Sequence, residues 1–269
     1  MPVLAIGPQD GLYYEYQPPP LAAGRTFVFF NALTADTAMW EAAVAPRLRE
    51  AGHGTLSFDY RGQSQSPFSP GTALDPDLIV DDARRLLAET APVRPVLVGL
   101  SIGGLFACRC RLAGAAADAL VLVNTLRRDG PRLQWINDAL VRCAEVGGLD
   151  LFRDLYLPLL FGEKWLAANR RNFLGEAPYQ PLDPESGHHN LLRHAATADW
   201  DLPYEALDLP VLVMTGLQDR VFLDPPVVAE LFARLPDGRR LDLPDAGHLI
   251  PAEAPDALVT ALIDFVGAM

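Results

Sequence analysis

The chain is short of positive charge. Its 269 residues include 22 lysine and arginine residues against 34 aspartate and glutamate residues, a formal net charge of −12, and Lys164 is its single lysine. A nucleic-acid binder needs a basic face to meet phosphates, and a polybasic membrane anchor needs clustered cations. The sequence therefore argues against both kinds of partner and favours a small-molecule ligand.

Long hydrophobic runs and cysteines are also scarce. No stretch reaches the roughly 18 apolar residues of a membrane span. Residues 1–11 have neither a basic segment nor a long apolar one, so we expect no signal peptide and a cytoplasmic location. Three cysteines, Cys108, Cys110 and Cys143, cannot all pair with one another, and we expect free thiols.

Short apolar runs recur along the chain and alternate with helical patterns. Several runs are continuous rather than alternating, which is typical of parallel strands covered on both faces, and the alternation predicts a right-handed α/β sheet. The first residues of the chain, including 12–16, could add antiparallel edge strands. The other expected strands are 27–31, 54–59, 95–100, 119–124, 209–215 and 239–243, and the helices between them are about 37–51, 75–90, 102–113, 225–235 and 254–267.

Residues 126–204 break this alternation, because they contain helical patterns and no convincing strand. We therefore predict a core formed by residues 1–125 and 205–269, with a helical cap of residues 126–204 inserted into it. Helices are expected in the cap at 133–145, 149–161, 164–174 and 188–196.

The strongest chemical signal is the sequence Gly99-Leu100-Ser101-Ile102-Gly103, which matches G-x-S-x-G. It follows an expected strand and precedes an expected helix, the context in which this motif forms a sharp turn that exposes the serine hydroxyl. Ser101 is therefore the predicted nucleophile. The glycines two positions before and after it, Gly99 and Gly103, allow neighbouring elements to approach the turn.

A serine nucleophile needs a base, and the base needs an acid to orient it. His248 follows the expected strand 239–243, and Asp219 follows the expected strand 209–215, so both fall where α/β sheets place their sites. Asp224 is the runner-up acid, and Asp245 is too close in sequence to His248 to orient it easily. The remaining histidines, His53, His188, His189 and His194, are poorer candidates, and no metal site is expected.

The order Ser101, Asp219, His248 belongs to α/β-hydrolases. Two further segments support this resemblance: residues 59–66 resemble the D-x-R-G-x-G-x-S loop with Ser64 in place of the second glycine, and residues 247–253 resemble G-H-x-x-x-x-E. The resemblance covers nearly the whole chain. It implies an α/β-hydrolase fold, with a mostly parallel eight-stranded sheet, helices on both faces and a cap after the sixth strand.

The segment 29–34 departs from the family's usual His-Gly pair, because Asn31 and Ala32 stand in those positions. Asn31 is similar to the corresponding asparagine of 3-oxoadipate enol-lactonases, which also share the residues matching Asp36, Met39 and Trp40. By position in the family, the backbone N–H groups of Leu33 and Ile102 would form the oxyanion hole.

Substrate contacts are expected from Asn31 and Trp40, and from the cap aromatics Trp135 and Tyr156, although cap aromatics also pack helices onto a core. Arg127, Arg128 and Arg132 lie at the base of the cap, where one could bind a substrate carboxylate or all could face solvent. The implied reaction is hydrolysis of a small ester or lactone through an acyl-enzyme, without a cofactor.

Other functions stay open at this point. Carbon–carbon bond hydrolysis and a cofactor-free haloperoxidase side activity use the same triad, and a ligand receptor can be built on the same fold. Epoxide hydrolases and haloalkane dehalogenases are disfavoured, because they need an aspartate at the position of Ser101. A homodimer is a candidate assembly.

Overall fold

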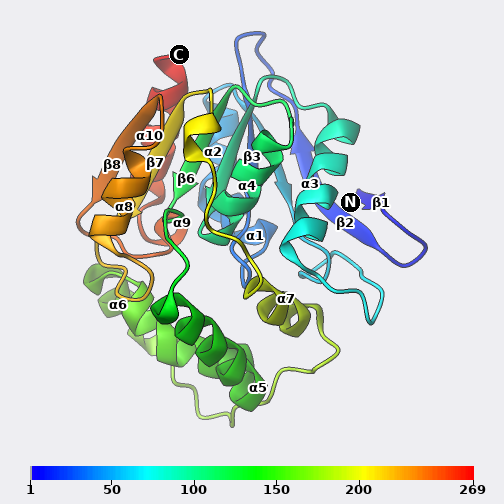
Figure 1. Cartoon of the computed structure of the whole chain (residues 1–269), viewed down its shortest axis with the longest axis vertical. Helices are drawn as coiled ribbons and strands as arrows, with labels where there is room; N and C mark the ends of the chain where they lie inside the picture. Colours follow the sequence, from blue (N-terminus) through cyan, green and yellow to red (C-terminus); the bar gives the residue numbers. More distant parts are fainter. Residues whose placement is uncertain (1) are drawn as a thin grey trace.

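A twisted sheet of eight strands runs through the molecule in a computed structural model that describes residues 2–269 (Figure 1). The strand order is β1-β2-β4-β3-β5-β6-β7-β8, with antiparallel pairing of β1, β2 and β4 and parallel pairing from β4 to β8. The strands are β1 (Val3–Ala5), β2 (Gly11–Gln17), β3 (Thr26–Phe30), β4 (Gly54–Phe58), β5 (Pro95–Leu100), β6 (Ala119–Val123), β7 (Val211–Gly216) and β8 (Gly238–Leu243). The predicted mostly parallel α/β sheet is confirmed.

Helices cover both faces of this sheet, which is why its central strands are apolar throughout. Along β3, Val28 and Phe30 enter one hydrophobic cluster, while Phe27 and Phe29 enter the other. The first cluster lies against α3 (Pro76–Thr90), α4 (Ile102–Leu112) and α8 (Pro225–Phe232), and the second against α1 (Thr37–Ala43), α2 (Ala45–Glu50) and α10 (Pro255–Gly267). Alternate side chains therefore supply two cores, one on each side of the sheet.

The expected single helix over residues 37–51 is wrong in one respect. The structure has two helices, α1 and α2, that meet at Val44. Pro46 lies in the first turn of α2, and because proline has no backbone N–H, it cannot continue the hydrogen-bond ladder of α1. Proline is well tolerated at the start of a helix, so a second helix begins there.

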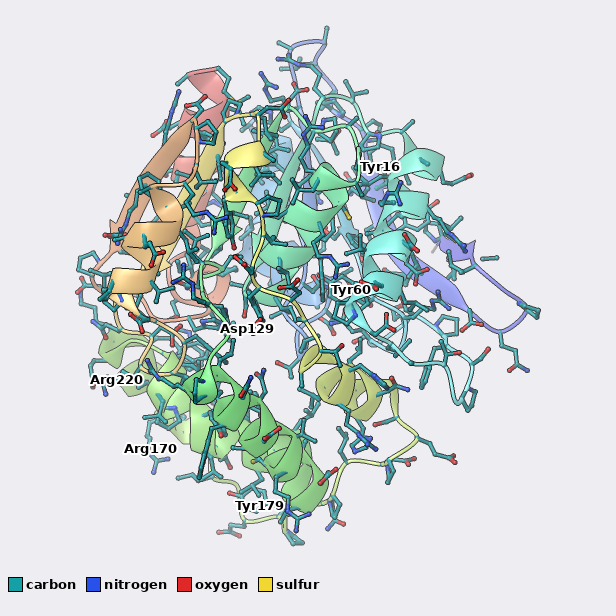
Figure 2. The ribbon with its side chains drawn as sticks, viewed as in Figure 1. Tyr16, Tyr60, Asp129, Arg170, Tyr179 and Arg220 are labelled. Carbon is teal, nitrogen blue, oxygen red and sulfur yellow. The ribbon has the colours of Figure 1, made fainter. Side chains whose placement is uncertain are left out.

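The chain between β6 and β7 forms helices at the carboxyl ends of the strands, in the lower part of Figure 1. They are α5 (Pro131–Leu160), α6 (Glu163–Asn169) and α7 (Gly187–Ala195), with short 3₁₀ turns at Arg170–Asn172 and Tyr204–Ala206. All except the last turn fall wholly within residues 126–204, where the sequence predicts a cap. In Figure 2, Arg170 and Tyr179 lie on the outer side of this segment, away from the sheet.

Helix α5 bends sharply at Gly148. The sequence predicts two helices here, at 133–145 and 149–161, and the structure agrees, because Gly148 has a non-helical φ of 70° and ψ of −166° that divides α5 into two helical halves. A side chain at Gly148 would collide with the carbonyl oxygen of Gln180, in addition to the strain of its positive φ. The bend lets one helix lie across the carboxyl end of the sheet with two differently directed halves.

Three other sequence expectations concern thiols, edges and membranes. Cys108, Cys110 and Cys143 are buried and form no disulfide, and burial raises the pKa of Cys108 and of Cys110 to about 12.

Strand β7 starts at Val211 rather than at residue 209, because Pro210 lacks the N–H that would extend the ladder. Within residues 2–269, no helix combines the length and the apolar character needed to cross a bilayer.

Candidate active site

Ser101 occupies a sharp turn between β5 and α4. Its φ of 57° and ψ of −123° are unusual for a residue with a side chain, and the backbone N–H donates to Val123 O at 2.8 Å. A side chain at Gly103 would collide with the carbonyl oxygens of Phe30 and Asn31, so this position requires glycine. The turn predicted from G-x-S-x-G is therefore present, with Ser101 at its apex.

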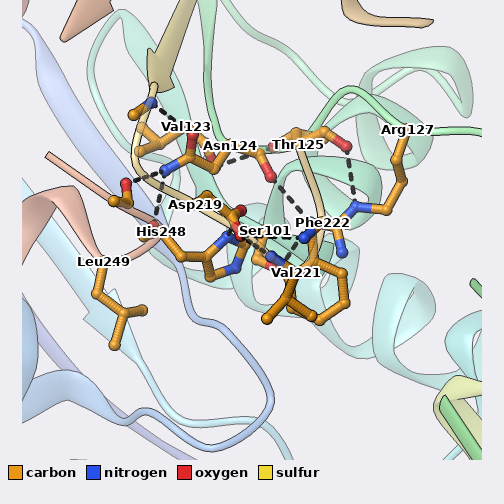
Figure 3. Close-up of polar contacts among 12 residues, drawn as sticks. Ser101, Val123, Asn124, Thr125, Arg127, Asp219, Val221, Phe222, His248 and Leu249 are labelled. Atoms are coloured by element: carbon orange, nitrogen blue, oxygen red, sulfur yellow. Dashed lines mark hydrogen bonds and ion pairs between the residues drawn. The ribbon is translucent and has the colours of Figure 1, made fainter. Parts of the chain in front are cut away.

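His248 and Asp219 form a buried hydrogen-bonded pair, which Figure 3 shows beside Ser101. His248 Nδ1 lies 2.6 Å from Asp219 Oδ2, and the side chains are 5% and 2% exposed. Asp219 Oδ1 accepts the N–H groups of Val221 and Phe222 at 2.9 and 3.0 Å. Burial alone would raise the pKa of Asp219, but His248 and these N–H donors hold it below its usual value. The carboxylate is therefore kept ionised against the imidazole.

The two other acids weighed from the sequence lie elsewhere. Asp224 caps α8 by accepting the N–H of Val227, and Asp245 forms an exposed ion pair with Lys164. Both roles are structural ones at the surface of the fold. The structure thus brings Asp219, and neither alternative, into contact with His248.

Asn124, directly after β6, holds the loop that carries His248. Its Nδ2 donates to the carbonyl oxygens of Gly247 and His248 at 3.0 and 2.7 Å, while its Oδ1 accepts the N–H of Gly216 at 2.8 Å. Asn124 has a φ of 49°, a left-handed conformation that asparagine adopts more readily than most residues. Sequence reasoning missed this residue, although an asparagine immediately after a buried strand is a signal for such a turn.

Glu253, in α9 (Ile250–Glu253), holds the same loop from the other side. Its carboxylate accepts the N–H groups of Gly162, Gly247 and Leu249 at 2.6, 2.8 and 2.9 Å. The backbone N–H of His248 also donates to Leu160 O at 2.5 Å. Burial raises the pKa of Glu253, and the three donors and His248 oppose that rise. The histidine loop is therefore bonded directly to the end of α5.

Asn31 and Trp40, expected to contact substrate, lie inside the fold and bond to each other. Trp40 Nε1 donates to Asn31 Oδ1 at 2.8 Å, and Asn31 Nδ2 donates to Phe58 O at 2.8 Å. Trp40 also stacks on Phe29 with ring centroids 4.5 Å apart. Both side chains are fully buried and engaged in fastening the loop after β3 to β4 and α1.

Gln63 fixes the backbone of that loop. Its Nε2 donates to the carbonyl oxygens of Ala32 and Leu33, both at 3.1 Å, and its Oε1 accepts the N–H of Tyr60 at 2.9 Å. A trans peptide directs its C=O and its N–H in opposite directions. Because Gln63 holds the carbonyl of Ala32, the N–H of Leu33 in the same peptide points away from Gln63.

A cavity of about 120 Å³ joins these parts. Ser101, His248, Leu33 and Ile102 line it from the sheet, and apolar residues of α5 and α7 cover it, among them Leu140, Phe152, Leu157, Leu160 and Leu192. Trp135 and Tyr156, the cap aromatics expected to contact substrate, are not among the described residues that line this cavity. Trp135 is 78% exposed on α5, and Tyr156 stacks on Phe152 with centroids 5.5 Å apart.

Arg127 completes the cavity wall, and Figure 3 shows it reaching toward Ser101. Its Nη2 donates to Ser101 Oγ at 3.0 Å and to Asn124 O at 2.8 Å. Among residues 2–269 this guanidinium is the only hydrogen-bond partner of the Ser101 hydroxyl, and His248 is not bonded to it. Burial lowers the pKa of Arg127 to about 10, so the group stays charged at neutral pH.

Curated sequences and solved structures include proteins similar to this chain along most of its length. The chain is 26% identical over 266 residues to RutD, a proposed carbamate hydrolase from Variovorax paradoxus, covering 95% of this chain and 96% of that one. It is 28% identical over 237 residues to BpoC, a proposed non-heme bromoperoxidase from Mycobacterium tuberculosis, covering 86% and 89%. The solved enol-lactonase of Burkholderia xenovorans LB400 has the same fold, with a TM-score of 0.80, 23% identity and coverage of 99% and 100%.

The family model described as the alpha/beta hydrolase family matches residues 27–261. That span contains the sheet from β3 to β8 together with Ser101, Asp219 and His248. The chain therefore belongs to the alpha/beta hydrolase family.

Proposed function

We propose that this protein is a serine hydrolase that cleaves an ester or lactone of a small molecule, with Ser101, His248 and Asp219 as its triad. The observation that carries the proposal is the buried 2.6 Å contact between His248 Nδ1 and Asp219 Oδ2, at the cavity that Ser101 also lines. A serine hydroxyl is a weak nucleophile, and an imidazole oriented by a carboxylate is the arrangement that activates it.

The reaction is acyl transfer in two halves. With Nδ1–H directed at Asp219, the Nε2 atom of His248 is free to accept the proton of Ser101 as Oγ attacks the carbonyl carbon. The imidazolium then protonates the leaving oxygen, which breaks the ester bond and leaves the acyl group on Ser101. Water attacks this acyl-enzyme with His248 again as base, and the serine is regenerated.

The N–H groups of Leu33 and Ile102 are the proposed oxyanion hole. Both residues line the cavity, and the hold of Gln63 on Ala32 O supports an N–H of Leu33 turned toward the reacting centre. Each such donor contributes about 2.7–4 kcal/mol to the transition state. Side chains and backbone amides supply every step, so the mechanism includes no cofactor.

The cavity wall supports a small acyl group. Apolar residues of α5 and α7 cover the space beside Ser101, and the volume of about 120 Å³ suits a compact substrate. Relatives named for carbamate and enol-lactone hydrolysis support acyl transfer.

Labelling with a fluorophosphonate, followed by intact-mass measurement and peptide mapping, tests the proposal. We expect one adduct, on Ser101, together with hydrolysis of short p-nitrophenyl esters or simple lactones. The Ser101→Ala variant should lose both, while Ser64→Ala, an exposed serine bonded to Asp36, should keep both. Absence of an adduct on folded wild-type protein would contradict the assignment of the nucleophile.

A further inference from the structure

Arg127 carries a buried positive charge without an acidic partner in its immediate surroundings. It is 6% exposed, and within residues 2–269 no carboxylate oxygen forms an ion pair with its guanidinium. Asp219 acts on it from beyond ion-pair distance, and both Asp219 oxygens already accept hydrogen bonds. A buried charge without a partner is costly, which makes an anion from outside the chain the natural counterpart.

The guanidinium is also fixed in direction. Its carbon lies 4.6 and 4.4 Å from the ring centroids of Trp200 and Phe222, contacts that hold a planar cation in place. Its Nε approaches Thr125 O at 3.4 Å, and Nη2 donates to Asn124 O and to Ser101 Oγ. Its Nη1 makes no hydrogen bond to any residue of the described chain. An edge formed by Nη1 and Nη2 matches the two oxygens of a carboxylate.

We infer that Arg127 binds a carboxylate carried by the substrate itself, so that the enzyme acts on short acyl esters or lactones with a negative charge near the scissile carbonyl. This inference rests on the proposed function, because it places the anion beside the nucleophile. It excludes long neutral acyl chains as preferred substrates, although the rest of the cavity is apolar.

The 3.0 Å distance from Arg127 Nη2 to Ser101 Oγ limits the spacing within the substrate. A carbonyl carbon in position for attack lies about 3–3.5 Å from the nucleophile. A carboxylate oxygen on a guanidinium lies about 2.7–2.9 Å from nitrogen. The two groups must therefore be joined by only a few bonds, as in a half-ester of a four- or five-carbon dicarboxylic acid or a lactone with a short carboxylate arm.

Occupation of Arg127 would also change Ser101. A carboxylate on Nη2 replaces Ser101 Oγ as acceptor, which releases the hydroxyl from the guanidinium and makes it available to His248 Nε2. An anionic substrate thus assembles the nucleophile and base as it binds, and a neutral ester lacks this effect. Discrimination between the two should appear in kcat as well as in KM.

Binding can be tested without turnover. Calorimetric titration of the Ser101→Ala protein with monomethyl glutarate should show saturable binding, and dimethyl glutarate should bind at least about 30-fold more weakly. Adding Arg127→Gln should abolish the preference for the charged ligand. Adding Arg128→Gln instead, which removes an exposed arginine paired with Glu230, should leave it unchanged. Equal binding of the two esters, or a preference that survives Arg127→Gln in folded protein, would overturn the inference.

Turnover gives the second measurement, with monomethyl glutarate and methyl pentanoate compared by methanol release. Wild-type enzyme should favour the charged ester, and Arg127→Lys, which keeps the charge and loses the planar edge, should retain only part of that preference. Preference for methyl pentanoate would overturn the inference while leaving the proposed function intact. If monomethyl glutarate bound through Arg127 but no fluorophosphonate adduct formed on Ser101, the proposed function would be wrong and the anion site at Arg127 would be supported.

Discussion

The side chain of Asn124 donates to the backbone carbonyl of His248 at 2.7 Å, so a residue that takes no part in the triad holds the base in place. The same amide bonds Gly247 and Gly216, so it joins the loops that follow β6 and β8 to the last residue of β7. Strand ends that are far apart in sequence are thereby fixed to one another at the site. The position of His248 should therefore depend on Asn124.

Replacement of Asn124 by alanine should lower kcat on the order of 10- to 100-fold, because the carbonyl oxygens of Gly247 and His248 lose their donor and the loop that carries His248 shifts. KM should change little, since Asn124 is not expected to touch substrate. The free energy of unfolding should fall by about 2 kcal/mol as buried groups lose their partners. Asn172→Ala, at an exposed asparagine, is the matched control. An unchanged kcat would refute the positioning role.

Exchange of Asp219 for asparagine should reduce kcat by roughly 10⁴-fold, because an amide no longer selects the required tautomer of His248. Asp224→Asn should leave kcat unchanged, since asparagine caps a helix as well as aspartate does. Steady-state kinetics on one ester decides between them. If the two variants exchanged these outcomes, Asp224 would be the orienting acid.

Gln63→Leu should impair the oxyanion hole. The variant removes the donors to Ala32 O and Leu33 O, so we expect kcat to fall about 10- to 100-fold, less than the full loss of an oxyanion donor. Affinity for a trifluoromethyl ketone, which forms a tetrahedral adduct with the nucleophile, should fall in parallel. Gln180→Ala provides an exposed glutamine control. Loss of stability with normal ketone affinity would mean that Gln63 only supports the fold.

Stability should depend on pH through Asp59. Its carboxyl is fully buried at the end of β4, and burial raises its pKa to about 6, against donors that include the N–H of Thr37. Between the ordinary aspartate pKa of 3.8 and pH 6, the folded state binds more protons than the unfolded state, so this group makes stability fall as pH rises. The contribution is at most about 3 kcal/mol.

The Asp59→Asn variant isolates this contribution. The free energy of unfolding of wild type and variant is measured with urea at pH 4 and at pH 7. The change from pH 4 to pH 7 should be more negative for the wild type than for the variant, which lacks the carboxyl of residue 59. The variant should gain stability relative to wild type as pH rises. A wild-type-minus-variant difference that stays constant over this range would show that Asp59 does not carry the raised pKa.

The sheet and the three triad candidates were predictable because each depends on local order. Ser101 and Asp219 follow the apolar strands β5 and β7, and His248 follows the half-exposed edge strand β8; parallel strands bring their carboxyl ends to one edge. The division of α1 from α2 was also accessible, since Pro46 is visible in the sequence. These features need no knowledge of how distant side chains pack.

The substrate side of the cavity was not predictable in this way. Trp135 and Tyr156 lie on α5, and the positive φ of Gly148 changes the face that each half of the helix turns inward. Arg127, Arg128 and Arg132 are close in sequence, yet one is buried at Ser101, one pairs with Glu230 and one donates to Val221 O. Tertiary packing alone separates them.

The hydrogen bond from the backbone N–H of His248 to Leu160 O attaches the base to α5, the helix that covers the cavity. Glu253 strengthens this attachment through Gly162. A ligand that displaces the end of α5 transmits that displacement to the imidazole through a single peptide group. The shape of the cavity and the position of His248 are therefore linked. Substitutions in α5 that are chosen to enlarge the cavity will also move the imidazole and so change kcat.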